Sequence, residues 1–202
     1  RRITTIKEAE VQFNLLPTTD INFFPEWRED LPTITEIEKT VLDRIKARYR
    51  YHRASGNLAE SLVNLVVLSP LLELAGFYDA PFQIKGEVPI EVSVISPISE
   101  TESEVVSNEL WIVVLESKGT ELNLDIAIPQ TLAYMMANPK SEYPTFAMIT
   151  NGGEFFFIKV IKQGTPQYDI SRIFSHLPLN NEFYEVLRIL KKISNSLKNV
   201  TI

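Results

Sequence analysis

One apolar run limits the fold of this chain more than any other feature. Residues 110–115 read Leu-Trp-Ile-Val-Val-Leu, six apolar residues in succession. A run of this length without alternating polar residues is typical of a strand buried on both faces, in the middle of a sheet. Glu116, Ser117 and Lys118 follow it directly. The sequence therefore predicts a central strand that ends in charged residues.

Helical and strand-like patterns surround this run. A capping box at Thr33 and Glu36 predicts the start of a helix with the apolar face Ile34, Ile37, Val41, Ile45 and Tyr49. Further helices are predicted over 57–76, 124–137 and from about 181, the last with the apolar face Phe183, Val186, Leu187, Leu190 and Ile193. Strands are predicted over 82–94 as one long or bent strand, at 105–106, and as a hairpin over 146–158 with Asn151 and two glycines in its turn. This order predicts an α/β fold with a mixed central sheet flanked by helices.

The length of 202 residues predicts one domain with an N-terminal extension. We expect residues 1–56 to form an irregular arm and a helix packed on the core, and residues 57–202 to form the α/β domain with its C-terminal helix. No apolar run approaches 18 residues, so we expect a soluble, cytoplasmic protein without a membrane partner.

Composition excludes several classes of site. The chain has no cysteine, which excludes disulfides, zinc–thiolate sites and cysteine nucleophiles. It carries no glycine-rich phosphate-binding motif, so NTPase and dinucleotide-binding interpretations lack their signature. The net charge of −6 argues against a non-specific DNA-coating protein, but is compatible with an enzyme that meets DNA through one local patch and bound metal.

The end of the central strand is the strongest chemical candidate. Glu116 and Lys118 are two residues apart, so in a strand they would point to the same face. A carboxylate there can ligate Mg²⁺, and a neighbouring ammonium can stabilise charge on a phosphate. The alternative is a surface ion pair where the strand leaves the core.

Four stretches in this order resemble the PD-(D/E)xK nuclease superfamily. They are most similar to the N-terminal nuclease domain of type I restriction enzyme R subunits and its stand-alone bacterial relatives. The matching stretches are residues 60–76, 111–118, 130–134 and 146–152. The resemblance implies a restriction-endonuclease-like core in the order αβββαβ, and Mg²⁺- or Mn²⁺-dependent hydrolysis of DNA phosphodiester bonds in restriction–modification.

The resemblance also implies roles for individual residues. Glu116 would be a metal ligand, Lys118 the phosphate- or water-facing ammonium, and Glu60 the helical acid that assists them. Gln130 and Tyr134 would form the family's QxxxY pair beside the DNA. The family's second-strand Asp has no counterpart here. Spacing from Glu116 points to Glu102 as the second metal ligand, and Glu91 is the alternative in a better strand context.

Several of these residues have a structural alternative. Asn57 and Glu60 form a capping box of their own, so Glu60 could hold a helix terminus. Tyr134 could be a core residue with its hydroxyl at the edge. The basic residues between Arg44 and Arg53 could line a DNA backbone, or form a solvated helix face.

A different class of function stays open at this point. The chain could be a catalytically degenerate relative that binds nucleic acid or another protein. It has no helicase motif, so a translocase or specificity subunit would have to supply any ATP-driven movement. A homodimer is a further option for its assembly.

Overall fold

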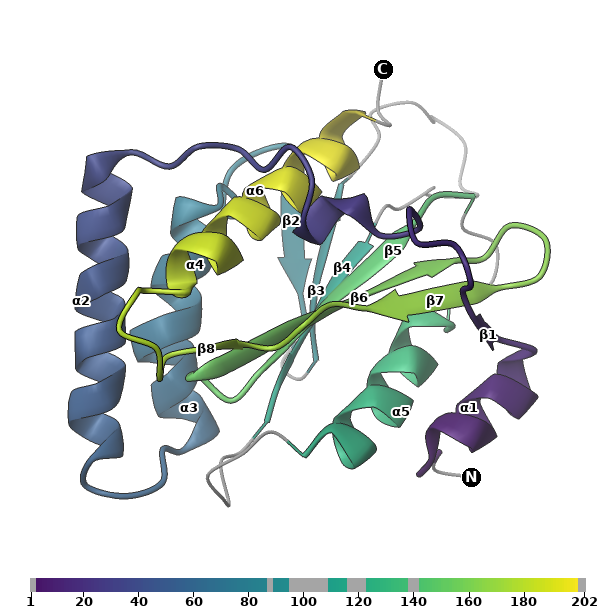
Figure 1. Cartoon of the computed structure of the whole chain (residues 1–202), viewed down its shortest axis with the longest axis horizontal. Helices are drawn as coiled ribbons and strands as arrows, with labels where there is room; N and C mark the ends of the chain where they lie inside the picture. The colour runs from purple at the N-terminus through teal and green to yellow at the C-terminus, as the bar shows by residue number, and fades with distance from the viewer. Residues whose placement is uncertain (1–2, 87–88, 95–108, 116–122, 138–141, 200–202) are drawn as a thin grey trace.

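A computed structural model describes residues 3–86, 89–94, 109–115, 123–137 and 142–199. It shows a mixed α/β fold built on one eight-stranded sheet in the order β1-β7-β6-β5-β4-β3-β2, with β8 paired to β6 (Figure 1). The strands are β1 (Leu16–Pro17), β2 (Phe82–Lys85), β3 (Ile90–Val94), β4 (Glu109–Val114), β5 (Thr145–Thr150), β6 (Glu154–Ile161), β7 (Gln167–Ile170) and β8 (Phe174–Ser175).

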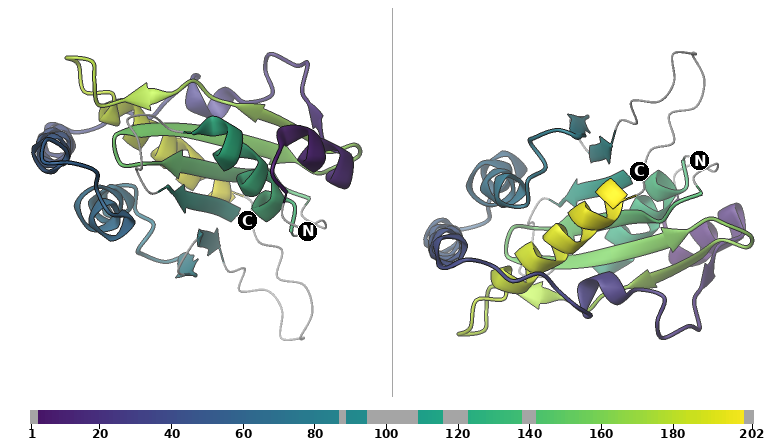
Figure 2. Two further views of the ribbon diagram at one scale, coloured as in Figure 1. Left: turned by 90° about the horizontal axis from the view of Figure 1, so that it is seen from below. Right: turned by 90° about the horizontal axis from the view of Figure 1, so that it is seen from above.

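Helices cover both faces of this sheet. They are α1 (Ile6–Phe13), the 3₁₀ turn η1 (Pro25–Trp27), α2 (Glu36–Arg53), α3 (Glu60–Val63), the π-helical turn η2 (Asn64–Leu68), α4 (Ser69–Leu74), α5 (Leu124–Met135) and α6 (Phe183–Lys198). Helices α1 and α5 lie on one face and α6 on the other, while α2 and α3 are seen nearly end-on at one side (Figure 2). None of the helices in the described ranges combines the length and the apolar character that a bilayer crossing requires.

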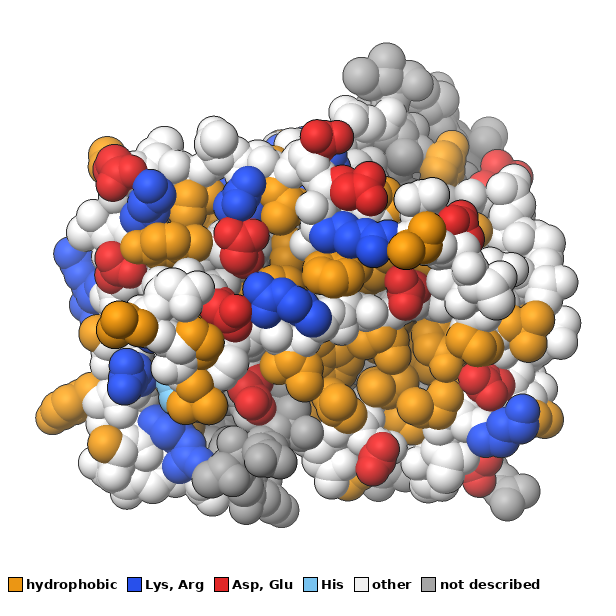
Figure 3. Space-filling view, viewed as in Figure 1, with side chains coloured by type: hydrophobic (Ala, Val, Ile, Leu, Met, Phe, Trp, Pro, Cys, Tyr) orange, Lys and Arg blue, Asp and Glu red, His pale blue; other side chains and the backbone are white. Residues whose placement is uncertain are grey.

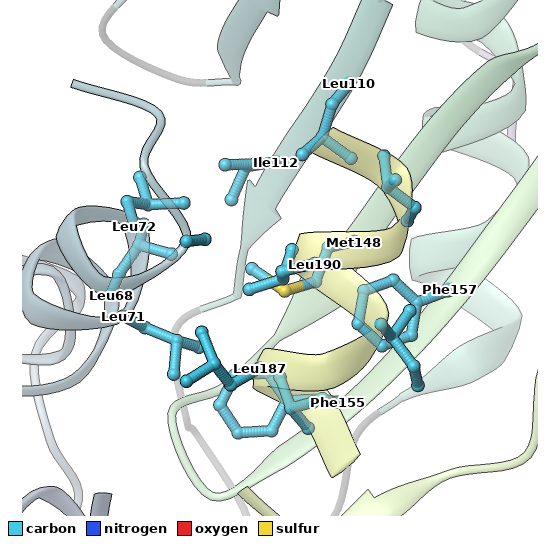
Figure 4. Close-up of a cluster of buried hydrophobic side chains, with 14 of the residues drawn as sticks. Leu68, Leu71, Leu72, Leu110, Ile112, Met148, Phe155, Phe157, Leu187 and Leu190 are labelled. Carbon is cyan, nitrogen blue, oxygen red and sulfur yellow. The ribbon is translucent and has the colours of Figure 1, made fainter. Parts of the chain in front are cut away.

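The sheet separates two apolar cores. The larger core joins β4, β5 and β6 to α2, the α3–η2–α4 segment and α6, and Figure 4 shows a part of it. The residues of this core that Figure 4 labels are Leu68, Leu71, Leu72, Leu110, Ile112, Met148, Phe155, Phe157, Leu187 and Leu190. The smaller core joins the opposite face of the same strands to α1 and α5. Strand β4 therefore contributes side chains to both cores, as its unbroken apolar run predicted.

The connections between the central strands form a meander, a crossover and a hairpin. Strands β2, β3 and β4 form an antiparallel meander, and β5 then lies parallel to β4 after the α5 crossover. Strands β5 and β6 form the antiparallel hairpin predicted from the glycine-rich turn. The final helix, α6, buries the apolar face predicted for it.

Two boundaries predicted from local patterns are wrong. Helix α2 is capped by Thr35, whose hydroxyl accepts the Glu38 N–H at 3.2 Å, and not by Thr33. Both threonines have a glutamate three residues later, so the local pattern did not separate them. Ile37, predicted on the buried face, is 77% exposed. The buried face is instead formed by Leu42, Ile45, Lys46 and Tyr49.

The predicted long strand over 82–94 is two strands, β2 and β3, paired as a hairpin. Gly86 explains the break, because its φ is +93° and a side-chain Cβ would lie 2.6 Å from the Pro89 carbonyl oxygen. Only glycine accepts that conformation and that approach without strain. The short strand predicted at 105–106 lies outside the described residues.

The N-terminal arm is not irregular. Thr5 and Glu8 form a capping box that starts α1, and β1 pairs in parallel with β7, with Leu16 opposite Gln167. Residues 1–56 therefore contribute an edge strand to the sheet as well as a helix packed on it.

The helix that leads into the meander contains a wide turn. In η2 the Ser69 N–H donates to the Asn64 carbonyl, five residues back, as in a π-helix. Pro70 follows directly, and in a regular α-helix its ring would clash with the Val66 carbonyl. The wide turn thus allows one continuous helical segment to run through a proline.

Candidate functional site

The carboxyl ends of the parallel strands β4 and β5 define the candidate site. The Leu115 N–H donates to the Thr150 carbonyl at 2.8 Å, so the two chains are still paired where β4 ends. In open α/β sheets, ligands bind preferentially beyond such ends. Glu116 and Lys118 follow Leu115 in the sequence and, like Glu102, lie outside the described residues.

A tightly packed wall forms one side of this end of the sheet. The turn between β5 and β6 carries Gly152 and Gly153, and a Cβ on Gly153 would lie 2.4 Å from the Tyr49 hydroxyl oxygen. A Cβ on Gly152 would lie 2.9 Å from a Val63 methyl carbon. Both glycines are therefore needed for the close approach of the turn to α2 and α3. The packing fixes the position of α3 relative to the carboxyl end of β5.

Glu60 is held at this same end. It is the first residue of α3, one turn before Val63, and its side chain is half-buried. The N-cap residue is Ala59, and no side chain makes a capping hydrogen bond there. The capping-box alternative for Asn57 and Glu60 is therefore wrong, because the Glu60 side chain does not cap α3.

Glu91 and Tyr134 are both neighbours of Trp111, away from this end of the sheet. Glu91 of β3 is the register partner of Trp111 in β4. The Tyr134 ring stacks on the Trp111 ring, with centroids 6.0 Å apart and planes 22° apart. Tyr134 is 37% exposed, and Gln130 lies one turn earlier in α5. The pair predicted to bind substrate is thus on the α5 face of the sheet, where Tyr134 has a packing role.

The candidate residues therefore form two groups. Trp111 precedes Leu115 by four residues, so Glu91 lies about 13 Å along the strand from the end of β4 at ~3.3 Å per residue. Glu60 belongs to α3, whose Val63 is part of the larger core, whereas Glu91 and Tyr134 adjoin Trp111, which packs against the smaller core. The structure brings Glu91 and Tyr134 together around Trp111 and leaves Glu60 separate from them.

Glu109 is a neighbour of Glu91 that sequence analysis did not identify. Glu109 is 4% exposed and accepts a hydrogen bond from the Trp111 indole at 3.2 Å. Burial, and then the Glu109 carboxylate, raise the pKa of Glu91, while Lys85 opposes this shift. Burial lowers the pKa of Lys162, and Glu109 opposes that shift. Side chains alternate between the two faces of a strand, so Glu109 and Trp111 of β4 share one face of the sheet. This alternation does not reveal which residues of the neighbouring strands they contact.

Divalent cations prefer sets of oxygen ligands such as carboxylates. Among the described residues, no three His, Cys, Asp or Glu side chains are grouped closely enough to hold a metal ion. The carboxylates of Glu116, Glu102 and Glu60 have the right donor chemistry, and of these only Glu60 is described. No protein-family model matches this chain, and a search of curated proteins returns no significant match.

His176 is a further residue at this end that the sequence did not single out. Its backbone N–H donates to the Gly153 carbonyl at 2.8 Å, and its ring packs edge-on against Tyr49 at 4.9 Å. Its Nδ1 atom is buried and has no hydrogen-bond partner among the described residues. Burial, and then Arg50, Lys46 and Arg53, lower the pKa of His176 below its ordinary value of 6.5.

This depressed pKa predicts a loss of stability in mild acid. The unfolded chain binds the His176 proton at a higher pH than the native protein, so protonation favours unfolding as the pH falls below about 6.5. We expect His176→Gln to lose less stability than the wild type between about pH 7.5 and pH 5.5. Urea unfolding midpoints across this range measure the difference. His52→Gln is the matched control, and identical pH profiles for wild type and His176→Gln would contradict the assignment.

Proposed function

We propose that this chain is a Mg²⁺-dependent endonuclease domain with a restriction-endonuclease-like core, which hydrolyses phosphodiester bonds in DNA. One observation carries the proposal. A helix, an antiparallel three-strand meander, a crossover helix and a strand parallel to β4 follow one another as α4, β2, β3, β4, α5 and β5. This is the αβββαβ order that the resemblance implied, and Glu116 and Lys118 stand directly after its central strand.

In this proposal, carboxylates at the end of β4 hold the metal. Glu116 is one ligand, and Glu60 assists from the first turn of α3. Glu102 is favoured over Glu91 as the second ligand, because Glu91 lies beside Trp111 and about 13 Å before the end of β4. A bound Mg²⁺ supplies Lewis acidity and lowers the pKa of a coordinated water.

The remaining side chains act on the DNA. Lys118 stabilises the negative charge that develops on the phosphate during attack by water. Gln130 and Tyr134 contact the substrate from α5, with the Tyr134 ring held by its stacking on Trp111. Target choice and movement along DNA would be supplied by a separate specificity or translocase subunit.

Metal binding and cleavage test this function together. We expect Mn²⁺ or Mg²⁺ to bind the wild type in a calorimetric titration, and plasmid DNA to be cut in the same buffer. Glu116→Ala should lose the binding heat and the cleavage, because the metal loses a ligand. Glu73→Ala is the matched control, since it removes an exposed glutamate from α4.

The outcomes separate the two classes of function. Cleavage that survives in Glu116→Ala but depends on metal would place the active site elsewhere and overturn the assignment. Equal, negligible heats in wild type and Glu116→Ala, with DNA binding and no cleavage, would instead identify a degenerate nucleic-acid-binding module.

A further inference from the structure

The basic residues of α2 have unequal surroundings. Lys46 is buried and donates to the carbonyls of Pro178 at 2.7 Å and Asn180 at 3.3 Å, so it holds the segment before α6. Arg44 and Arg48 are exposed on the helix surface. Near the C-terminal end of α2, Arg50 is also exposed and Arg53 is half-buried, and both act electrostatically on His176 together with Lys46. The basic stretch is therefore not one uniform solvated face.

Arg50, Arg53 and His176 form a group that we name the α2-end cluster. It is attached to the sheet through the Gly153 carbonyl, which accepts the His176 N–H, and through the Tyr49 ring, which packs on the His176 ring. At the lower left of Figure 3, basic side chains lie at the surface near a small exposed area of histidine. Elsewhere on that face, acidic and basic side chains are interspersed.

The cluster lies at the same end of the sheet as the candidate site. The turn that carries Gly153 closes the carboxyl end of β5, and Thr150 at that end accepts the Leu115 N–H. The backbone of His176 is thus bonded to the same turn that borders the end of β4. Figure 1 shows α2 and α3 reaching this end together.

Two guanidinium groups have the chemistry to bind a phosphodiester. Arginine offers a planar fork of N–H donors that matches phosphate oxygens, and it keeps its charge at all relevant pH values. The protein carries a net charge of −6, so a local group of cations is needed to bring a polyanion to it. Helix-end capping is the structural role to be separated from this, because Arg53 also donates to the Gly56 carbonyl at 3.0 Å.

We propose that Arg50 and Arg53, at the C-terminal end of α2, bind backbone phosphates of DNA outside the scissile bond. The bound strand then passes over the C-terminal end of α2 as it leaves the site. This inference rests on the proposed function, because it takes DNA as the substrate of the same end of the sheet.

The experiment measures DNA affinity against salt concentration without requiring cleavage. Fluorescence anisotropy of a labelled duplex, with Ca²⁺ in place of Mg²⁺, gives the slope of log affinity against log salt. Arg50→Gln combined with Arg53→Gln should reduce this slope by about one to two, with about 0.9 expected for each phosphate charge neutralised. Arg44→Gln combined with Arg48→Gln is the matched control, which removes two exposed charges from the same helix and should leave the slope unchanged.

Two further variants keep a structural effect apart from a binding effect. Arg50→Gln alone keeps the Arg53 contact with Gly56 and should still reduce the slope by about one. Arg50→Lys combined with Arg53→Lys keeps both charges and should restore most of the slope. The thermal midpoint of each variant is measured. The salt slopes are then compared only at temperatures where every variant is folded.

Each outcome decides between the proposals. An unchanged slope in Arg50→Gln, an equal fall in the control pair, or a wild type without salt-dependent DNA binding would overturn the phosphate site. If the slope falls as expected while wild type with Mg²⁺ cuts no DNA, the phosphate site stands and the nuclease proposal fails. If wild type cuts DNA and the α2-end variants bind and cut it equally well, the nuclease stands and the phosphate site fails.

Discussion

Glu26→Gln should destabilise the protein by about 3 kcal/mol, the lower end of the cost of breaking a buried ion pair. Lys159 of β6 lies 2.7 Å from the Glu26 carboxylate, and both side chains are buried, at 7% and 12% exposure. The ammonium also lies within 6.0 Å of the rings of Phe23, Phe24 and Phe146. Without the carboxylate, the Lys159 amino group is left in an apolar core with only an amide oxygen as acceptor.

Urea unfolding of four proteins measures this effect. Glu26→Gln is compared with Lys159→Met, with Glu26→Leu combined with Lys159→Met, and with Glu36→Ala as control. The double replacement should recover most of the lost stability, because a buried ion pair exchanged for apolar groups is often close to neutral. Glu36 pairs with Lys39 at the surface, so its loss should cost less than about 1 kcal/mol. A cost for Glu26→Gln as small as that of the surface control would show that Lys159 reaches water.

Lys118→Ala should slow DNA cleavage by roughly two to three orders of magnitude, the usual effect of deleting one preorganised electrostatic group. Its ammonium acts on charge that develops only during phosphoryl transfer. The DNA affinity should therefore survive, and the loss should fall on kcat. Single-turnover cleavage of plasmid DNA with saturating Mg²⁺ measures the rate, and anisotropy measures the affinity.

Lys7→Ala is the matched control, because the Lys7 side chain is 80% exposed in α1. A thermal midpoint equal to that of the wild type establishes that the Lys118 variant is folded. The nuclease proposal fails if purified wild type cuts no plasmid, linear duplex or single strand with Mg²⁺ or Mn²⁺. It fails equally if Lys118→Ala cuts as fast as wild type.

The elements that could be predicted from the sequence are those with a strong local pattern. The run 110–115 identified β4 and its place inside the sheet, and the amphipathic repeat of 183–193 identified α6. Asn151 and its two glycines identified the β5–β6 turn. In each case the pattern arises from burial or backbone conformation within a few residues, which a single sequence records.

Elements without such a pattern were missed. Strand β1 is two exposed residues, Leu16 and Pro17, and it exists only because β7 lies beside it. Helix α1 buries only Ala9, so its apolar periodicity is weak, although its capping box was readable at Thr5. Tertiary pairing decides these elements, and no local propensity records it.

The candidate site divides in the same way. The family resemblance indicated Glu60, Gln130 and Tyr134, but the stacking of Tyr134 on Trp111 joins two separate elements. His176 reaches Tyr49 and Gly153 from the far end of the chain. Such contacts form only when distant elements pack in the folded sheet. The sequence therefore indicated candidate residues but did not show which residues they contact.

The parallel pairing of β1 with β7 has a consequence for synthesis of the protein. Leu16 emerges from the ribosome long before its partner Gln167, which follows only after the meander and the β5–β6 hairpin. Contacts between such distant residues form slowly, because a long loop must close first. The outer edge of the sheet is therefore completed last, and until then β7 presents free backbone groups to other chains. Expression conditions that slow aggregation of nascent chains should raise the soluble yield, and a shortened version that starts after Pro17 should lower it.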